Sequence, residues 1–240
     1  MYNVIVFVVA VLSGVTAAIA GFGIGSLLTP LIAALYGIET AVAAVAVPHA
    51  LATAVRFVRL RSQVDWRVVR SFGMLSAIGG LAGAATYIRI GSKALTIVLA
   101  TLLIATSVAG LTGWNTKKTP TGALAGAFGL LSGFFGGVAG NQGGLRAAAL
   151  MSFGISGAAF VATSTAVGLM VDAVRTPIYL WRSGQQLYSL WVPIGIASAG
   201  VLIGTLAGER VLLGLSPERF RRLVSALIGG LGMWLLVQLR

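Results

Sequence analysis

The sequence predicts an all-α protein that crosses a membrane several times and is built from two homologous halves. Of the 240 residues, 58% are hydrophobic and only 9% are charged, whereas soluble domains have roughly 25% charged residues. The apolar residues form long runs separated by short loops, and about 20 such residues suffice for a membrane-spanning helix. Glycine-rich stretches interrupt two of these runs, at positions that correspond between the two halves of the chain.

Composition also excludes several classes of function. The net charge of +12 does not indicate nucleic-acid binding, because the arginines lie at the ends of apolar runs, as in the cytoplasmic loops of membrane proteins. The chain has no cysteine and one histidine, so disulfides and thiolate metal sites are excluded, and we expect neither a metal nor another cofactor. The N-terminus lacks the basic region of a signal peptide, so we expect the first apolar run to stay in the membrane.

Eight membrane segments are predicted in order along the chain. They are residues 4–36, 39–58, 68–88, 93–112, 121–150, 156–180, 188–208 and 218–238. The first and fifth are too long for one straight span, and glycine, a poor helix former, breaks both of them. Pro120, Pro193 and Pro217 lie near predicted helix starts, where proline is tolerated. Ser216 and Glu218 flank the last of these prolines as an N-cap residue and a first-turn acid.

Short sequence matches that keep their order predict an internal repeat. Leu12-Ser13-Gly14 matches Leu131-Ser132-Gly133, and Ala54-Val55-Arg56 matches Ala173-Val174-Arg175, in both cases 119 residues later. Glycines of the third and seventh segments match in the same order. Two halves with glycine-broken segments in corresponding positions indicate a binding site where the repeats meet.

The two repeats are predicted over residues 1–115 and 116–240, and their relative orientation depends on the broken segments. If these segments are re-entrant hairpins, each half crosses the membrane an odd number of times and the repeats are inverted. If they cross fully, the repeats are parallel. Arg56, Arg61 and Arg67 flank a loop that the positive-inside rule places in the cytoplasm. The lysine and arginine residues of the other loops slightly favour the inverted arrangement.

The first glycine-rich stretch, residues 21–26, predicts one half of an anion site. Glycines let the backbone turn tightly, and the N–H groups at the start of the following helix can face an anion. The alternative is close helix packing by small residues. A nucleotide-binding loop is excluded because no strand precedes the stretch and no lysine follows it. The candidate binding residues here are Gly23, Gly25 and Ser26.

The second stretch adds polar side chains to the same pattern. Asn141 and Gln142 offer hydrogen-bond donors, and Arg146 offers a charged planar fork that suits an oxyanion. An arginine at membrane depth usually faces a cavity or a substrate. The alternative is that Arg146 pairs with Asp172 or with backbone carbonyls as a structural link. The candidate binding residues here are Asn141, Gln142, Gly143, Gly144 and Arg146.

Polar residues of two other apolar segments complete the candidate site. Thr163, Ser164 and Thr165 either line the cavity or bond back to their own helix. His49 and Asp172 are candidates for coupling transport to protons or cations, because histidine titrates near neutral pH and Asp172 is the one acid clearly inside an apolar run. The alternatives are a structural histidine beside a proline kink, and a local pair of Asp172 with Arg175 near the membrane interface.

These features resemble the TauE/SafE family of sulfite exporter-like permeases. The resemblance rests on the glycine-rich break at residues 21–30, its recurrence at residues 136–144, and Asp65-Trp66-Arg67 before the third segment. It extends over essentially the whole chain and implies two repeats of about four segments each. Members are associated with sulfite, sulfonates and other sulfur-containing anions, so the resemblance implies a substrate of this kind.

We therefore predict a secondary transporter in the cytoplasmic (inner) membrane that moves a sulfur-containing oxyanion or organosulfonate by alternating access. A passive anion channel, or a transporter of a non-sulfur organic anion, would use the same residues. We expect no enzyme, because the chain lacks a histidine pair, a cysteine and a second buried acid for a catalytic set. The expected partners are a small anion, the lipid bilayer and a second copy of the chain. Gly79, Gly80 and Gly83 form either a dimer face or a packing surface within the monomer.

Overall fold

The computed structural model describes residues 2–112, 123–141, 143–155, 157–211 and 217–239. Every regular element in these ranges is a helix. The first half contains α1 (Tyr2–Ala20), α2 (Ile24–Tyr36), α3 (Ile38–Leu60), η1 (Arg61–Gln63), α4 (Trp66–Val68), η2 (Val69–Gly73), α5 (Met74–Thr86), η3 (Tyr87–Arg89) and α6 (Ser92–Thr112). The second half contains α7 (Ala123–Ala139), α8 (Gly143–Ser152), α9 (Gly157–Ser189), α10 (Trp191–Val211) and α11 (Pro217–Val237).

Six helical stretches among the described residues are long and apolar enough to cross a membrane. They are Tyr2–Ala20, Ile38–Gln63, Trp66–Thr86, Ser92–Thr112, Gly157–Ser189 and Trp191–Gly208. This finding confirms the predicted class, an all-α protein that passes through the membrane several times.

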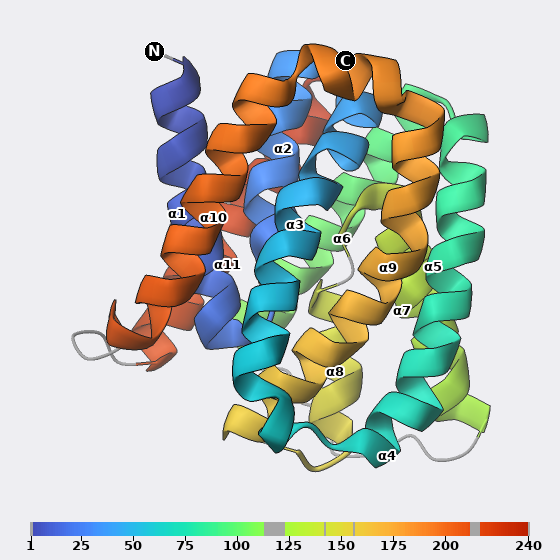
Figure 1. Ribbon diagram of the computed structural model, residues 1–240, viewed down its shortest axis with the longest axis vertical. Helices are drawn as coiled ribbons and strands as arrows, with labels where there is room; N and C mark the ends of the chain where they lie inside the picture. The colour runs from blue at the N-terminus through green and yellow to red at the C-terminus, as the bar shows by residue number, and fades with distance from the viewer. Residues whose placement is uncertain (1, 113–122, 142, 156, 212–216, 240) are drawn as a thin grey trace.

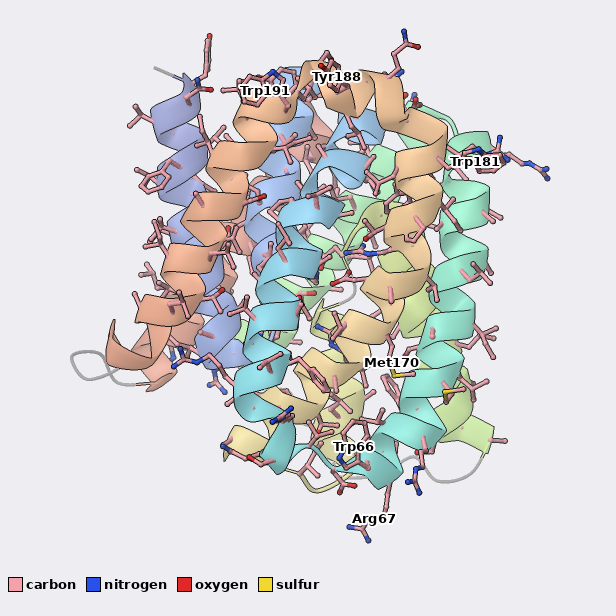
Figure 2. All side chains as sticks on the ribbon, in the orientation of Figure 1. Trp66, Arg67, Met170, Trp181, Tyr188 and Trp191 are labelled. Atoms are coloured by element: carbon pink, nitrogen blue, oxygen red, sulfur yellow. The ribbon has the colours of Figure 1, made fainter. Side chains whose placement is uncertain are left out.

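Helix α9 is longer than the apolar run that predicted it. The run ends near residue 180, but the helix continues through a polar stretch to Ser189. Its 33 residues span about 50 Å at 1.5 Å per residue, which exceeds a hydrocarbon core of about 30 Å. Exposed Trp181, Tyr188 and Trp191 lie at this end of the molecule, and Trp66 lies at the other (Figure 2). Tryptophan and tyrosine prefer the membrane–water interfaces, so these residues indicate where the two interfaces lie along the molecule.

The helices pack in pairs that link the two halves of the chain. α1 packs against α10, α5 against α7, α3 against α9, and α6 against α11. In Figure 1, α3 runs down and α9 runs up, so these two helices are antiparallel. The start of α1 and the end of α11 lie at the same end of the molecule. The division into two repeats and their inverted orientation remain predictions, and this arrangement accords with them.

Glycines let these pairs approach closely. A Cβ atom at Gly79 or Gly83 of α5 would overlap with backbone atoms of α7, and one at Gly80 would lie 2.7 Å from Val171 of α9. All three glycines therefore face helices of the same chain, where small residues allow close packing. Of the two predicted roles for these glycines, the structure shows packing within the chain and not a dimer face, because this surface is already buried inside the molecule.

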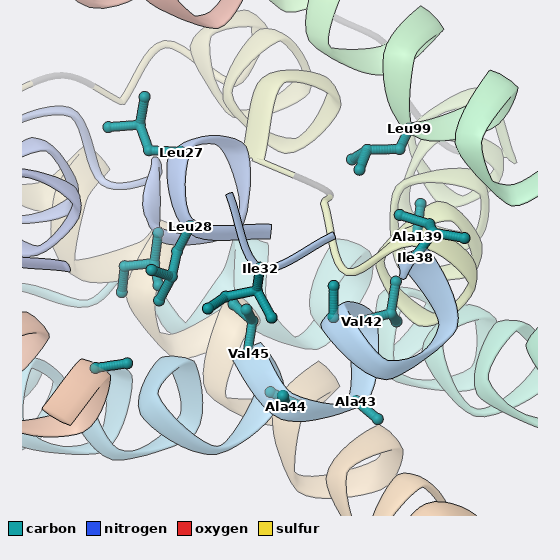
Figure 3. Packing of buried hydrophobic residues seen from close by; sticks show 14 of the residues in the cluster. Leu27, Leu28, Ile32, Ile38, Val42, Ala43, Ala44, Val45, Leu99 and Ala139 are labelled. Carbon is teal, nitrogen blue, oxygen red and sulfur yellow. The ribbon is translucent and has the colours of Figure 1, made fainter. Parts of the chain in front are cut away.

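Helix α2 is a half-helix enclosed by protein. All of its residues from Ile24 to Pro30 are buried. Figure 3 shows Leu28 and Ile32 of α2 near Val45 of α3, within one apolar cluster. A helix that is apolar on every side is stable only when it is surrounded. This packing holds the N-terminus of α2, and with it the glycine-rich break, inside the molecule.

The connection between α3 and α5 is anchored by Asp65. Its carboxylate accepts hydrogen bonds from the backbone N–H groups of Arg67, at 3.0 Å, and Val68, at 3.4 Å. The Arg67 side chain donates a third bond at 3.4 Å. Asp65 is therefore the N-cap of α4, a position that aspartate favours.

Candidate functional site

Two backbone breaks lie inside the helical bundle. α1 ends at Ala20 and α2 begins at Ile24, with Gly21 at φ 76° and Gly23 at φ 135°. In the second half, α7 ends at Ala139 and Gly140 follows at φ 68°. Residues with side chains rarely adopt these positive φ values, so the sequence needs glycine at these three positions.

The two breaks touch each other although they are more than 100 residues apart in the sequence. A Cβ atom at Gly25 would overlap with the carbonyl oxygen of Gly140. Ser26 Oγ donates a hydrogen bond to Asn141 Oδ1 at 3.1 Å. A Cβ atom at Gly143, the first residue of α8, would lie 2.5 Å from Phe22 Cβ in the first break. The structure thus brings together most of the predicted residues of both glycine-rich stretches.

One predicted residue of the second stretch faces away from this contact. Gly144 faces α6, where a Cβ atom would overlap with Thr106. Gln142 lies outside the described residues.

Several hydrogen-bond donors at this junction have no protein partner. The amide nitrogen of Asn141 and the hydroxyl of Thr29 are buried and unpartnered among the described residues. Thr29 lies beside the second break, because its Oγ1 would be 3.7 Å from a Cβ atom at Gly140. The first N–H groups of a helix have no partner within it, and Gly23 has no side chain to cap those of α2. A ligand that accepts hydrogen bonds would satisfy these groups.

Arg146 of α8 is enclosed by the same junction. Its side chain is 1% exposed. Nε donates to Ser164 Oγ of α9 at 3.0 Å, and Nη2 donates to the Gly21 carbonyl at 3.5 Å. Nη1 has no hydrogen-bond partner among the described residues. Gly168 leaves room for this group, because a Cβ atom there would lie 3.1 Å from Nη1. Arg146 therefore bonds to a backbone carbonyl, as the structural alternative expected, yet keeps one unpartnered nitrogen.

Asp172 of α9 is the centre of a buried ionic cluster. Its Oδ1 accepts from Arg175 Nε at 2.9 Å, and its Oδ2 lies 2.6 Å from His49 Nδ1 of α3. Thr53 Oγ1 lies 3.3 Å from the same histidine nitrogen. The predicted pair of Asp172 with Arg175 is present. It is more than a local pair, because both side chains are buried and the carboxylate also contacts His49 of α3.

The ionic cluster is connected to the second break through helix α7. Arg175 Nη1 donates to the Gly136 carbonyl at 2.6 Å, and Tyr179 Oη donates to the Gly137 carbonyl. These carbonyls belong to the last turn of α7, where a cation is favourable to the helix dipole. Movement of the Asp172–Arg175 pair would therefore act directly on the end of α7.

The three consecutive hydroxyls of α9 hold other groups in place. Thr163 Oγ1 accepts from the Asp65 backbone N–H at 3.0 Å. Ser164 receives Arg146, and Thr165 Oγ1 accepts from Arg56 Nε at 2.7 Å. Thr165 also bonds back to its own helix, and Ser164 donates to the Gly21 carbonyl at 3.0 Å. Thr163, Ser164 and Thr165 therefore position the chain around the site.

Arg56 is a residue of this region that the sequence analysis did not propose. It is 4% exposed, and its Nη1 has no hydrogen-bond partner among the described residues. One available signal was its match with Arg175 in the internal repeat, since both arginines follow Ala-Val in corresponding segments. Its position near the end of an apolar run instead suggested a cytoplasmic loop.

Comparison with known proteins identifies the family. The model of the family described as sulfite exporter TauE/SafE matches residues 6–235. Searches of curated proteins and of solved structures found no match. The family match spans both backbone breaks, the arginines around them and the Asp172 cluster. By this match over nearly its whole length, the chain belongs to the sulfite exporter TauE/SafE family of membrane transporters.

Proposed function

We propose that this protein is a secondary transporter that binds a sulfur-containing oxyanion or an organosulfonate where its two broken helices meet. The observation that carries the proposal is Arg146, a buried guanidinium with an unpartnered nitrogen. A buried charge is costly unless it is paired, and ionisable residues at membrane depth are usually functional. Membership in the family, which implies transport of sulfite or related anions, supports the same substrate class.

The proposed anion lies among donors from both halves of the chain. Arg146 Nη1 supplies the charge, and Asn141 Nδ2 and Thr29 Oγ1 supply neutral hydrogen bonds. The first N–H groups of α2 add the positive end of a helix dipole. A tetrahedral oxyanion has several acceptor oxygens and can receive more than one of these bonds at once. We include Ser26 as the residue that holds Asn141 in place through its 3.1 Å hydrogen bond.

Alternating access would break two different sets of contacts in turn. On one side of the site, Arg56 and the Asp65 backbone bind α9 through Thr165 and Thr163. On the other side, Tyr179 binds the end of α7, and Tyr87 bonds to Ser183 at 2.8 Å. We propose that each set closes one side of the membrane. The anion then reaches the site from only one side at a time.

Coupling to protons is proposed for His49 and Asp172. Histidine is the side chain whose charge changes near neutral pH. The charged groups that act on His49 are Asp172, Arg175 and Arg146. A proton would give His49 a positive charge. His49 would then compete with Arg175 for the Asp172 carboxylate, and the contact between Arg175 and Asp172 would weaken. Because Arg175 also holds the Gly136 carbonyl, this change would reach the second break and the bound anion.

The test compares Arg146→Ala with the matched control Arg182→Ala, an exposed arginine of α9. Purified proteins are heated with sulfite, thiosulfate, sulfate, small sulfonates or carboxylates. An anion present at 100 times its Kd stabilises its target by about 2.7 kcal/mol. We expect a sulfur anion to raise the melting temperature of the wild type and of Arg182→Ala but not of Arg146→Ala. A folded Arg146→Ala protein that binds normally would show that the site is wrong.

Transport is tested by flux into proteoliposomes. Saturable exchange of a sulfur anion supports a transporter, whereas flux that grows linearly with concentration supports a passive channel. Stabilisation by carboxylates and not by sulfur anions would reject the proposed substrate class.

A further inference from the structure

The buried ionisable groups carry an excess of positive charge. Among the described residues, the acidic, basic and histidine side chains that are buried are His49, Arg56, Arg146, Asp172 and Arg175. The single carboxylate of Asp172 is bound by Arg175 and His49. Arg56 and Arg146 have hydroxyl and carbonyl partners, so within the described part of the chain two buried positive charges have no carboxylate beside them. Water is scarce at this depth, and each unpaired charge is expensive there.

Arg56 and Arg146 are held by neighbouring hydroxyls of one helix although they come from two other helices. Arg56 belongs to α3 and Arg146 to α8, and both helices pack against α9. Each arginine donates through Nε to a hydroxyl of α9, Arg56 to Thr165 and Arg146 to Ser164. These hydroxyls belong to consecutive residues, whose Cα atoms are about 3.8 Å apart. Among charged residues, Arg146 acts most strongly on Arg56, and the two repel each other.

In each of the two guanidinium groups, the corresponding nitrogen is available to a ligand. Nη1 of Arg56 and Nη1 of Arg146 are both buried and without a hydrogen-bond partner among the described residues. The two side chains are 4% and 1% exposed. Two like charges that act on each other, each with an unpartnered donor, are stabilised together by a ligand that carries one negative charge for each.

We propose that Arg56 is a second anion anchor beside Arg146, so that the site selects anions with two negative charges over monoanions of the same size. The two charges are either on one oxyanion or on a sulfonate with a second acidic group. This inference rests on the proposed anion site at Arg146. A monoanion would compensate one guanidinium and leave the other charge buried and repelled.

The structural alternative is that Arg56 only fastens α3 to α9 through Thr165. In that case the substitution Arg56→Gln would lower the melting temperature without changing which anions bind. Charge preference therefore separates the two roles, and stability alone does not.

The experiment measures binding of matched anion pairs by calorimetry on the purified full-length protein. Thiosulfate and methanesulfonate are similar tetrahedral anions with two charges and one. Sulfoacetate and its carboxamide have similar size and differ by one charge on the second group. The variants are Arg56→Gln, Arg146→Gln and the control Arg61→Gln, an exposed arginine of η1, which directly follows α3.

For the wild type and Arg61→Gln we expect the dianion of at least one pair to bind more tightly than its monoanion. A hydrogen bond to a charged group contributes about 1.5–3 kcal/mol, so Arg56→Gln should weaken dianion binding roughly ten- to hundredfold. Arg56→Gln should change the Kd of the monoanion by less than about threefold, because a monoanion compensates only one guanidinium. Preference in the thiosulfate pair alone indicates both charges on one oxyanion, and preference in the sulfoacetate pair alone indicates a second acidic group.

The outcomes separate this inference from the function on which it rests. If no sulfur anion binds the wild type, the proposed function itself fails. If both members of each pair bind the wild type equally, the inference is overturned even when Arg56→Gln does not fold. If Arg146→Gln loses all binding while Arg56→Gln keeps the wild-type preference, the anion site stands and Arg56 is only structural.

Discussion

The contact between the two breaks makes a sharp prediction about Gly143. An alanine Cβ atom at this position would lie 2.5 Å from Cβ, 2.8 Å from Cδ2 and 2.9 Å from Cγ of Phe22. Carbon atoms in ordinary contact are about 3.5–4.0 Å apart. The added methyl would therefore push the first break away from the second. The backbone itself would accept alanine, because Gly143 does not have a positive φ value.

Two opposing effects set the size of the change. Alanine favours a helix over glycine by up to about 1 kcal/mol, and less at the first residue of α8. Overpacking a filled interior costs about 1–3 kcal/mol. The clash wins, because it involves the base of the Phe22 side chain and not its flexible end. We expect Gly143→Ala to lose about 1–2 kcal/mol, which lowers the melting temperature by roughly 2–8 °C for a chain of this size.

Thermal unfolding of the purified protein tests this prediction in a double-mutant cycle with Phe22→Ala. If Phe22 is the obstacle, the double variant should be more stable than the sum of the single changes predicts, by about 1 kcal/mol. Gly195→Ala in α10 is the control, because nothing lies within 4 Å of its Cβ position, and it should be neutral or slightly stabilising. Additive effects of Gly143→Ala and Phe22→Ala would refute the close approach of the two breaks.

Three further predictions concern titratable groups. Asp172→Asn should destabilise the protein by about 3–5 kcal/mol because it leaves Arg175 buried without its carboxylate. His49→Gln should still bind the anion but lose the uptake that a pH gradient drives in proteoliposomes. Unchanged uptake would exclude His49 as the proton site. Burial raises the pKa of Asp65, but the hydrogen bonds from Arg67 and Val68 outweigh it and hold that pKa below its ordinary value. The ionised carboxylate therefore adds stability at neutral pH, and the higher melting temperature of wild type over Asp65→Asn should vanish as the pH falls through this pKa; a difference that is the same at every pH would contradict the assignment.

The helical architecture could be predicted because a bilayer imposes a length and a polarity on each segment. Apolar runs of about 20 residues leave few alternatives to a helix. The end of α9 was missed for a related reason. Beyond Trp181 the helix continues outside the hydrocarbon region. Polar residues such as Gln185 and Gln186 are compatible with a helix there. Hydropathy reports the span of the membrane and not the end of the helix.

The site could be predicted in part because polar residues are conspicuous in an apolar run. Asn141 and Arg146 stood out for that reason. Arg56 did not, because an arginine near the end of a run is normally a loop charge. Its burial depends on Thr165, which is 109 residues away. The partnership of His49 with Asp172, 123 residues apart, likewise has no local signal in the sequence, since only the packing of α3 against α9 creates it.

The choice of hydroxyl residues in α9 explains how this interior can hold three arginines for different purposes. Arg175 is bound by a carboxylate, so its charge is largely neutralised within the protein. Its side chain also holds the end of α7. Ser164 and Thr165 fix the direction of Arg146 and Arg56 through neutral oxygens. An aspartate at either position would hold its arginine more tightly but would cancel the charge that an anion must find. Neutral acceptors thus orient the two guanidinium groups and leave their charge available for the proposed anion.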